Sequence, residues 1–149
     1  MKRTSLKRTA WHRARKPHKP SSRKIKLKTI KSLRAACDAL IQQINRKKYE
    51  KCFICGSSNQ VAHHFFPKSV SSFLRYNAEN LVPLCNGCHM RLHQSGDPRY
   101  EQMIVSQKGE AWYQKLENHA RDYIKVDRIY YEEIKLRLEK EYNELLWIG

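Results

Sequence analysis

Two Cys-x-x-Cys pairs constrain the fold of this chain more than any other feature: Cys52 with Cys55, and Cys85 with Cys88. Each pair can bind one side of a metal ion from a tight turn, and four thiolates suit one tetrahedral zinc ion. We expect Gly56 and Gly87 to supply the backbone freedom that these turns need. The four cysteines therefore predict a structural zinc site that holds a small domain together.

Five further polar side chains lie between and after the two cysteine pairs. His63 and His64 form a doublet, and Asn80 lies shortly before the second pair. His89 and His93 are four residues apart, so on a helix they project from one face and can share a second metal ion. Adjacent residues of a regular strand point to opposite faces, so the doublet alone does not assign both histidines to one site.

The order of these residues resembles the HNH endonucleases, which are also called ββα-metal or His-Me finger nucleases. The resemblance lies in Cys-x-x-Cys, His-His, Asn-Leu-Val-Pro-Leu-Cys-x-x-Cys-His and x-x-x-His, and it covers residues 52–93. It implies a metal-dependent endonuclease that hydrolyses phosphodiester bonds in DNA. The fold it implies is α+β: a small ββα-metal core with zinc knuckles formed by the four cysteines, one preceding helix and a helical C-terminal tail.

The resemblance also implies a role for each histidine and for the asparagine. His64 is the general base, for which a neutral imidazole near pH 7 is suited. His89 is a metal ligand, with His63 and His93 as further ligands, and the catalytic ion is Mg²⁺ or Mn²⁺. Asn80 is expected to hydrogen-bond the opposite loop and so hold the His64 imidazole in its working orientation.

The flanks resemble the phage NinG (Rap) recombination proteins. The similarity lies in the helical segment before Cys52, in Ser95-Gly96, and in a helical tail that contains Gly109-Glu110. It implies a bacteriophage nuclease acting on branched recombination or replication intermediates. Two alternatives stay open: a packaging or restriction-type HNH nuclease that acts on ordinary duplex DNA, and a zinc-knuckle DNA-binding protein without catalytic activity.

The charge of the chain indicates a polyanionic partner, in the first place nucleic acid. The formal net charge is +16, and the pI is about 9.9. Residues 1–96 hold 21 Lys or Arg and 3 Asp or Glu, whereas residues 97–149 hold 9 and 11. The first part of the chain is therefore expected to contact DNA, at positions that include Lys68, Arg91, Arg13, Arg15 and Lys16.

Composition also bounds the cellular location. No apolar run reaches the length of a membrane span, and the start of the chain lacks the apolar segment of a signal peptide. Five cysteines, four of them in metal-type pairs, fit a reducing compartment better than disulfide bonds do. We expect a cytoplasmic protein, located in the host cytoplasm if the chain is phage-encoded.

Four segments follow from this pattern: a disordered basic arm at 1–29, an amphipathic helix at 30–50, the zinc-stapled nuclease core at 51–96, and a helical tail at 97–149. The helix is expected from Ile30 to about Lys48, packed on the zinc module, with Cys37 buried as a small apolar residue. The core is expected to contain strands at 60–66 and 81–84 and a short helix at 69–76.

The tail is expected to form three helices. The first runs from Pro98 to Gln107, and the second runs from Glu110 to about Tyr123. Asp127 is a plausible N-cap for a final helix with an apolar stripe of Ile134, Leu138, Tyr142 and Leu145. That stripe is either intramolecular core or the seam of a homodimer formed through the C-terminal helices.

Overall fold

The computed structural model describes residues 27–95 and 98–147, in which helices surround a small sheet. The arm at 1–26, with Arg13, Arg15 and Lys16, lies outside the described residues. The elements in chain order are α1 (Ile30–Lys48), β1 (Val61–His64), η1 (Leu74–Tyr76), η2 (Ala78–Asn80), β2 (Leu81–Leu84), α2 (Asn86–Ser95), α3 (Pro98–Lys108), α4 (Glu110–Ala120) and α5 (Arg128–Trp147). The expected α+β class is therefore confirmed.

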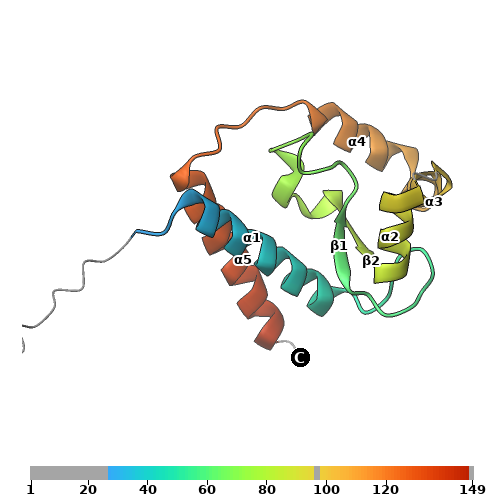
Figure 1. The fold of residues 1–149 in the computed structure, drawn as a ribbon, viewed down its shortest axis with the longest axis horizontal. Coiled ribbons are helices and arrows are strands. Elements are labelled where there is room, and N and C mark those ends of the chain that lie inside the picture. Colours follow the sequence, from blue (N-terminus) through green and yellow to red (C-terminus); the bar gives the residue numbers. More distant parts are fainter. Residues whose placement is uncertain (1–26, 96–97, 148–149) are drawn as a thin grey trace, which may run out of the picture.

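The sheet consists of β1 and β2, which pair antiparallel with Val61 opposite Leu84 and His64 opposite Leu81. Opposed residues share a face and neighbours alternate, so the register fixes two sets of side chains. Ala62, His64 and Leu81 lie on the face toward α1, whereas His63 and Val82 lie on the other. Figure 1 shows α1 and α5 on one side of the sheet and α2, α3 and α4 on the other.

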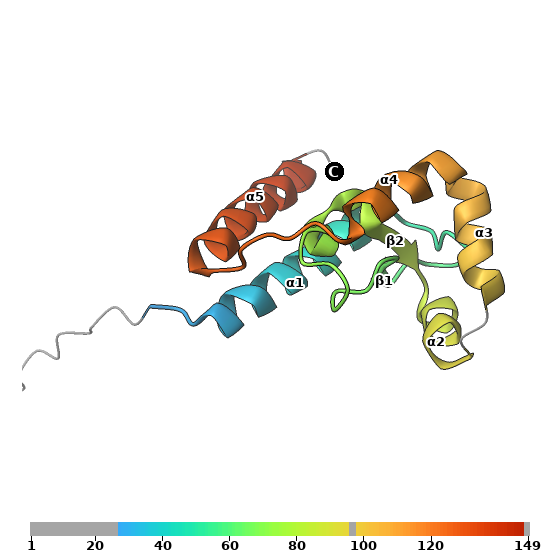
Figure 2. The same ribbon diagram turned by 90° about the horizontal axis from the view of Figure 1, so that it is seen from above.

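Helix α1 begins and ends where the apolar spacing predicts. Thr29 caps it by accepting a hydrogen bond from the Ser32 N–H at 3.2 Å. Its apolar face, which includes the fully buried Cys37, packs against α5 and Ala62. This face contacts Ala62, Tyr76 and Leu81 of the 51–96 segment, on which the helix was predicted to pack, and it also packs on α5. Figure 2 shows α5 alongside α1.

A polar contact docks α1 onto β1. The Gln42 side chain accepts from the Ala62 N–H at 2.9 Å and donates to the Ala62 carbonyl at 3.1 Å. The N–H and carbonyl of Ala62 point away from β2, and the Gln42 amide hydrogen-bonds both of them as a neighbouring strand would.

Two of the expected core elements are shorter than predicted. The first strand covers Val61–His64 only. Hydrogen bonds from the Gln60 N–H to the Leu84 carbonyl and from the Phe65 N–H to the Asn80 carbonyl extend the pairing at both ends. The helix expected at 69–76 is a single 3₁₀ turn, η1, because Pro67 opens a turn and the Ser71 hydroxyl accepts from the Leu74 N–H.

The tail divides between the two sides of the sheet. Helices α3 and α4 place Ile104 and Trp112 against Val82 and Leu84, on the face of the sheet opposite α1, and Leu116 against Leu74 of η1. Helix α5 begins at the predicted N-cap, where Asp127 Oδ1 accepts from the Tyr130 N–H at 3.0 Å. Its apolar stripe packs on α1, so the intramolecular alternative describes the stripe in this structure.

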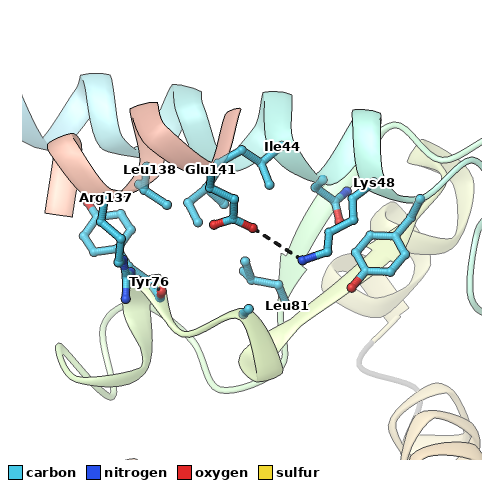
Figure 3. Close-up of a pocket in the computed structure, with 11 residues that line it drawn as sticks. Ile44, Lys48, Tyr76, Leu81, Arg137, Leu138 and Glu141 are labelled. Atoms are coloured by element: carbon cyan, nitrogen blue, oxygen red, sulfur yellow. Dashed lines mark hydrogen bonds and ion pairs between the residues drawn. The ribbon is translucent and has the colours of Figure 1, made fainter. Parts of the chain in front are cut away.

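A cavity of about 120 Å³ lies between α1, α5 and the start of β2. Ile44, Leu81 and Leu138 line it, and Figure 3 shows the ion pair of Lys48 with Glu141, 3.4 Å apart. No helix in the described ranges is long and apolar enough to cross a membrane.

Candidate functional site

The four paired cysteines come together in one cluster, hereafter the cysteine cluster (Cys52, Cys55, Cys85 and Cys88). Their sulfur atoms all lie within 4.8 Å of one another, and Cys55 Sγ is 3.6 Å from Cys85 Sγ. A tetrahedral zinc with Zn–S bonds of about 2.3 Å separates its sulfurs by about 3.8 Å. The cluster therefore fits a four-coordinate metal such as zinc, as the sequence predicted.

The first cysteine pair lies in a tight knuckle. The Gly56 N–H donates to the Cys52 carbonyl at 3.0 Å, and Gly56 has a φ of 71°, in the left-handed region that favours glycine. Gly87 does not have the expected role, because it lies inside α2 without a positive φ. The second cysteine pair is instead placed by the junction of β2 with the first turn of α2.

Hydrogen bonds prepare part of the cysteine cluster for metal binding. Hydrogen bonds from the Ser57 hydroxyl and the Cys88 N–H lower the pKa of the Cys85 thiol to about 6. The Ser57 side chain also lowers the pKa of Cys55, whereas burial raises that of Cys88. Because metals bind the thiolate form, the lowered pKa values favour ligation at Cys55 and Cys85.

Three histidines form a second group, hereafter the histidine cluster: His63 from β1, and His89 and His93 from α2. One ring nitrogen of each lies within 4.8 Å of the others, and the Nε2 atoms of His89 and His93 are 3.1 Å apart. The His63 ring centroid is 5.4 Å from both other rings. Imidazole ligands about 2.0–2.1 Å from a zinc ion need such nitrogen spacings, so the cluster fits one transition-metal ion.

Burial keeps the innermost histidine neutral. Desolvation, with the two neighbouring histidines, lowers the pKa of His63 to about 4, and burial also lowers the pKa of His89. A neutral imidazole has a free lone pair at pH 7, which is the form that ligates a metal. His93 lies at the exposed end of the cluster, so the cluster is open to solvent on that side.

The structure does not bring His64 into the histidine cluster. Its side chain lies on the opposite face of β1, where Nε2 is 2.9 Å from the Arg75 carbonyl. A carbonyl only accepts hydrogen bonds, so Nε2 carries the proton and Nδ1 keeps the lone pair. Burial lowers the pKa of His64 to about 4, with further lowering by Lys68 and Arg75.

Asn80 is fully buried and ties the loop after β1 to the start of β2. Its Oδ1 accepts from the Phe66 N–H at 2.7 Å, and its Nδ2 donates to the Phe66 and Leu74 carbonyls at 3.0 and 3.1 Å. These contacts match the loop-holding geometry expected for this amide. The Leu74 carbonyl directly precedes Arg75, whose own carbonyl accepts from His64.

The two described DNA-contact candidates lie on different surfaces. Lys68 is exposed, with Nζ 3.9 Å from an Asp38 carboxylate oxygen on the His64 side. Arg91 is exposed on α2 and donates to the Tyr100 hydroxyl at 3.3 Å. The structure therefore does not group them into one patch.

The sequence interpretation missed a polar stripe on α1. Asp38, Gln42 and Asn45 occur at spacings of four and three, and all three contact the core. The signal in the sequence was the helical spacing of these polar residues, which places them along the edge of the apolar stripe and so next to the core rather than on the solvent face.

Comparisons with protein-family models, with curated proteins and with solved structures find no match to this chain.

Proposed function

We propose that the chain is a metal-dependent HNH-type DNA endonuclease. The observation that carries the proposal is the histidine cluster, in which β1 and α2 bring three imidazoles together. A formal charge of +16 supports nucleic acid as the substrate. In this proposal the cysteine cluster holds a structural zinc, and the histidine cluster holds the catalytic ion.

The donor set of the histidine cluster bears on the choice of catalytic ion. Three imidazole nitrogens suit Zn²⁺ or Ni²⁺ better than Mg²⁺ or Mn²⁺, which favour oxygen ligands. We therefore propose a later transition metal as the catalytic ion, in place of the Mg²⁺ or Mn²⁺ expected from the sequence. Such an ion, when bound, supplies Lewis-acid stabilisation of the charge that develops on a phosphoryl oxygen.

His64 is the proposed general base. Its Nδ1 lone pair takes a proton from water as the water oxygen attacks phosphorus, and the bond from phosphorus to the leaving oxygen breaks. The leaving oxygen takes its proton from solvent. The Nε2–H to the Arg75 carbonyl, at 2.9 Å, holds the ring so that only Nδ1 is free to accept.

The position of the His64 side chain on the opposite face of β1 also supports a second candidate function. Because its ring lies across β1 from the histidine cluster, His64 suits a structural role as well, and the chain would then be a zinc-knuckle DNA-binding protein. Chelator-sensitive nicking of plasmid DNA separates the two, since a binding protein leaves the plasmid intact.

The test of the catalytic assignment is single-turnover cleavage at saturating enzyme. If His64 is the base, His64→Ala should fold, keep its zinc and bind uncleavable DNA normally, while cleavage falls by about two to four orders of magnitude. His89→Ala should lose both activity and the second metal ion. His119→Ala is the matched control, since this histidine belongs to neither cluster. Near-wild-type cleavage by His64→Ala would remove it from the mechanism.

The preferred substrate and the assembly belong to the same proposal. Branched DNA is proposed ahead of ordinary duplex, and a four-way junction compared with a linear duplex of equal length distinguishes them. A homodimer through the C-terminal helices would use the outer side of α5, which exposes Leu136 and Trp147, because the inner stripe packs on α1. Sedimentation with and without junction DNA measures the assembly.

A further inference from the structure

The single turn η1 is a point where several elements converge by hydrogen bonds to its backbone. Its three carbonyl oxygens each accept from a side chain of a different element: Leu74 O from Asn80, Arg75 O from His64, and Tyr76 O from Arg137 of α5. The distances are 3.1, 2.9 and 2.9 Å. The position of η1 therefore decides where the acceptor for His64 lies.

Asp38 of α1 holds the side chains of this turn. Its carboxylate accepts from Arg75 Nη2 at 2.6 Å and Nε at 3.3 Å, and from the Tyr76 hydroxyl at 3.0 Å. A guanidinium that meets a carboxylate through two nitrogens has a fixed plane as well as a fixed distance. The Arg75 side chain is only 17% exposed, so solvent screens this pair less than a surface pair.

The same face of α1 also holds the strand that carries His64. Gln42, one helical turn after Asp38, hydrogen-bonds both backbone groups of Ala62 at 2.9 and 3.1 Å. Asp38 and Gln42 therefore fix, from one rigid helix, the acceptor of the His64 ring and the backbone two residues before it. A helix that sets both ends of a hydrogen bond preorganises the imidazole between them.

We propose that Asp38 is a positioning residue for His64 and acts through Arg75, a role that rests on the proposed function of His64. The contact of the Asp38 carboxylate with the Arg75 guanidinium keeps the Arg75 carbonyl in line with His64 Nε2, so the ring stays in one tautomer and one orientation. Without the Asp38 carboxylate, η1 keeps its ties to Asn80 and Arg137 and the 3.5 Å contact of the Tyr76 hydroxyl with the Arg34 carbonyl, but Arg75 loses its tie to α1. The ring then loses its fixed acceptor, and Nδ1 is no longer held as the only free nitrogen.

The first readout is the tautomer of His64, observed by ¹⁵N NMR of the imidazoles in the full chain at one fixed pH. The wild type should give the pattern of an Nε2–H imidazole. Asp38→Ala should give averaged ring shifts, while Lys48→Ala, on the same helix but paired with Glu141, should keep the wild-type pattern. Asp38→Asn, which keeps the shape but removes the charge, should be intermediate and covers the case in which Asp38→Ala does not fold.

The second readout is the single-turnover cleavage rate with DNA affinity measured separately. Asp38→Ala should slow cleavage by about 10- to 100-fold with unchanged affinity, the span expected from a misplaced catalytic group. Asp38→Glu should recover part of the rate. A folded Asp38 variant with an unchanged His64 tautomer overturns the inference, whatever its cleavage rate. The NMR readout needs no cleavage. Near-wild-type cleavage by His64→Ala would therefore defeat the proposed function of His64 and still leave the positioning result readable.

Discussion

At the scale of single residues, Asn80 is the side chain whose surroundings constrain it most. It has no exposed surface, and both ends of its amide are used in hydrogen bonds to backbone groups. A buried backbone group without a partner costs far more than an average hydrogen bond contributes. The amide is therefore a structural requirement of the loop that carries the acceptor for His64.

We expect Asn80→Ala to lower the free energy of unfolding by about 2–4 kcal/mol, since it leaves the partly buried N–H and carbonyl of Phe66 without partners and the Leu74 carbonyl with only the Asn77 N–H. Asn118→Ala, on the exposed side of α4, should change it by less than about 0.5 kcal/mol. Urea unfolding followed by circular dichroism measures both. Equal stabilities of the two variants would show that water replaces the Asn80 contacts.

His64 predicts a pH dependence of stability. Burial lowers its pKa from 6.5 to about 4, so below pH 6.5 the unfolded chain binds a proton that the folded chain does not. Its contribution to stability is therefore present above pH 6.5 and is lost as the pH falls toward 4, by at most about 3 kcal/mol. His64→Gln should lose less stability than the wild type over this range. Parallel curves of unfolding free energy against pH would contradict the expectation.

Some residue-level features could be predicted from sequence, and others could not. The cysteine spacing and the i, i+4 histidines specify groups of side chains that local geometry brings together. The salt bridge between Asp38 and Arg75 joins residues 37 positions apart in the sequence, and no local pattern encodes that distance. The face of His64 was left open for the same reason, since only the register with β2 decides it.

At the scale of elements, the agreement between predicted and observed limits depends on whether the segment itself has a periodic apolar pattern. The apolar spacing predicted α1, and the sequence 81–84 predicted β2, both with the observed limits. The partner of α1 was not predictable in this way. The apolar stripes of α1 and α5 cover each other. This packing brings Cys37 Sγ to the carbonyl of Tyr131, 94 positions away in the sequence, to which it donates a hydrogen bond.

The pairing of α1 with α5 supports a comparison of two leucines on one helix. Leu138 is 1% exposed in the shared core, whereas Leu136 is 70% exposed. Leu138→Ala should lower the free energy of unfolding by about 2–5 kcal/mol, because it removes buried methyl groups and leaves a cavity. Leu136→Ala should lie within about 0.5 kcal/mol of the wild type. Similar losses for both would mean that the outer side of α5 is covered in solution.

The knuckle and the β2–α2 junction share one small apolar core with Val82, Leu84 and Ile104, and the cysteine cluster is expected to add the cross-link that holds them together. Cys85→Ser should lose the structural zinc and unfold this part of the chain. Cys37→Ala removes a thiol from the α1–α5 core and should keep its zinc. Zinc per chain, measured by elemental analysis beside a thermal unfolding curve, tests both. A folded, zinc-free Cys85→Ser protein would contradict the assignment.

At the scale of the whole molecule, charge is distributed unevenly along the chain. Residues 1–96 carry most of the positive charge, whereas 97–149 are nearly balanced. The balanced part supplies α5 to the cluster around α1, and α3 and α4 to the two clusters of buried residues on the other side of the sheet. The division indicates that DNA affinity depends mainly on the first part of the chain.

The last prediction concerns the basic arm. Deleting residues 1–24 lowers the formal charge from +16 to +6, because they contain ten Lys or Arg and no Asp or Glu. Basic residues that contact phosphates release counterions from any duplex, at about 0.9 in the slope of log affinity against log salt per phosphate. Deletion should therefore weaken binding to all DNA sequences alike and flatten this slope. Replacing Arg13, Arg15 and Lys16 by Gln keeps the length and should flatten it less. A slope that neither change alters would show that the arm does not contact DNA.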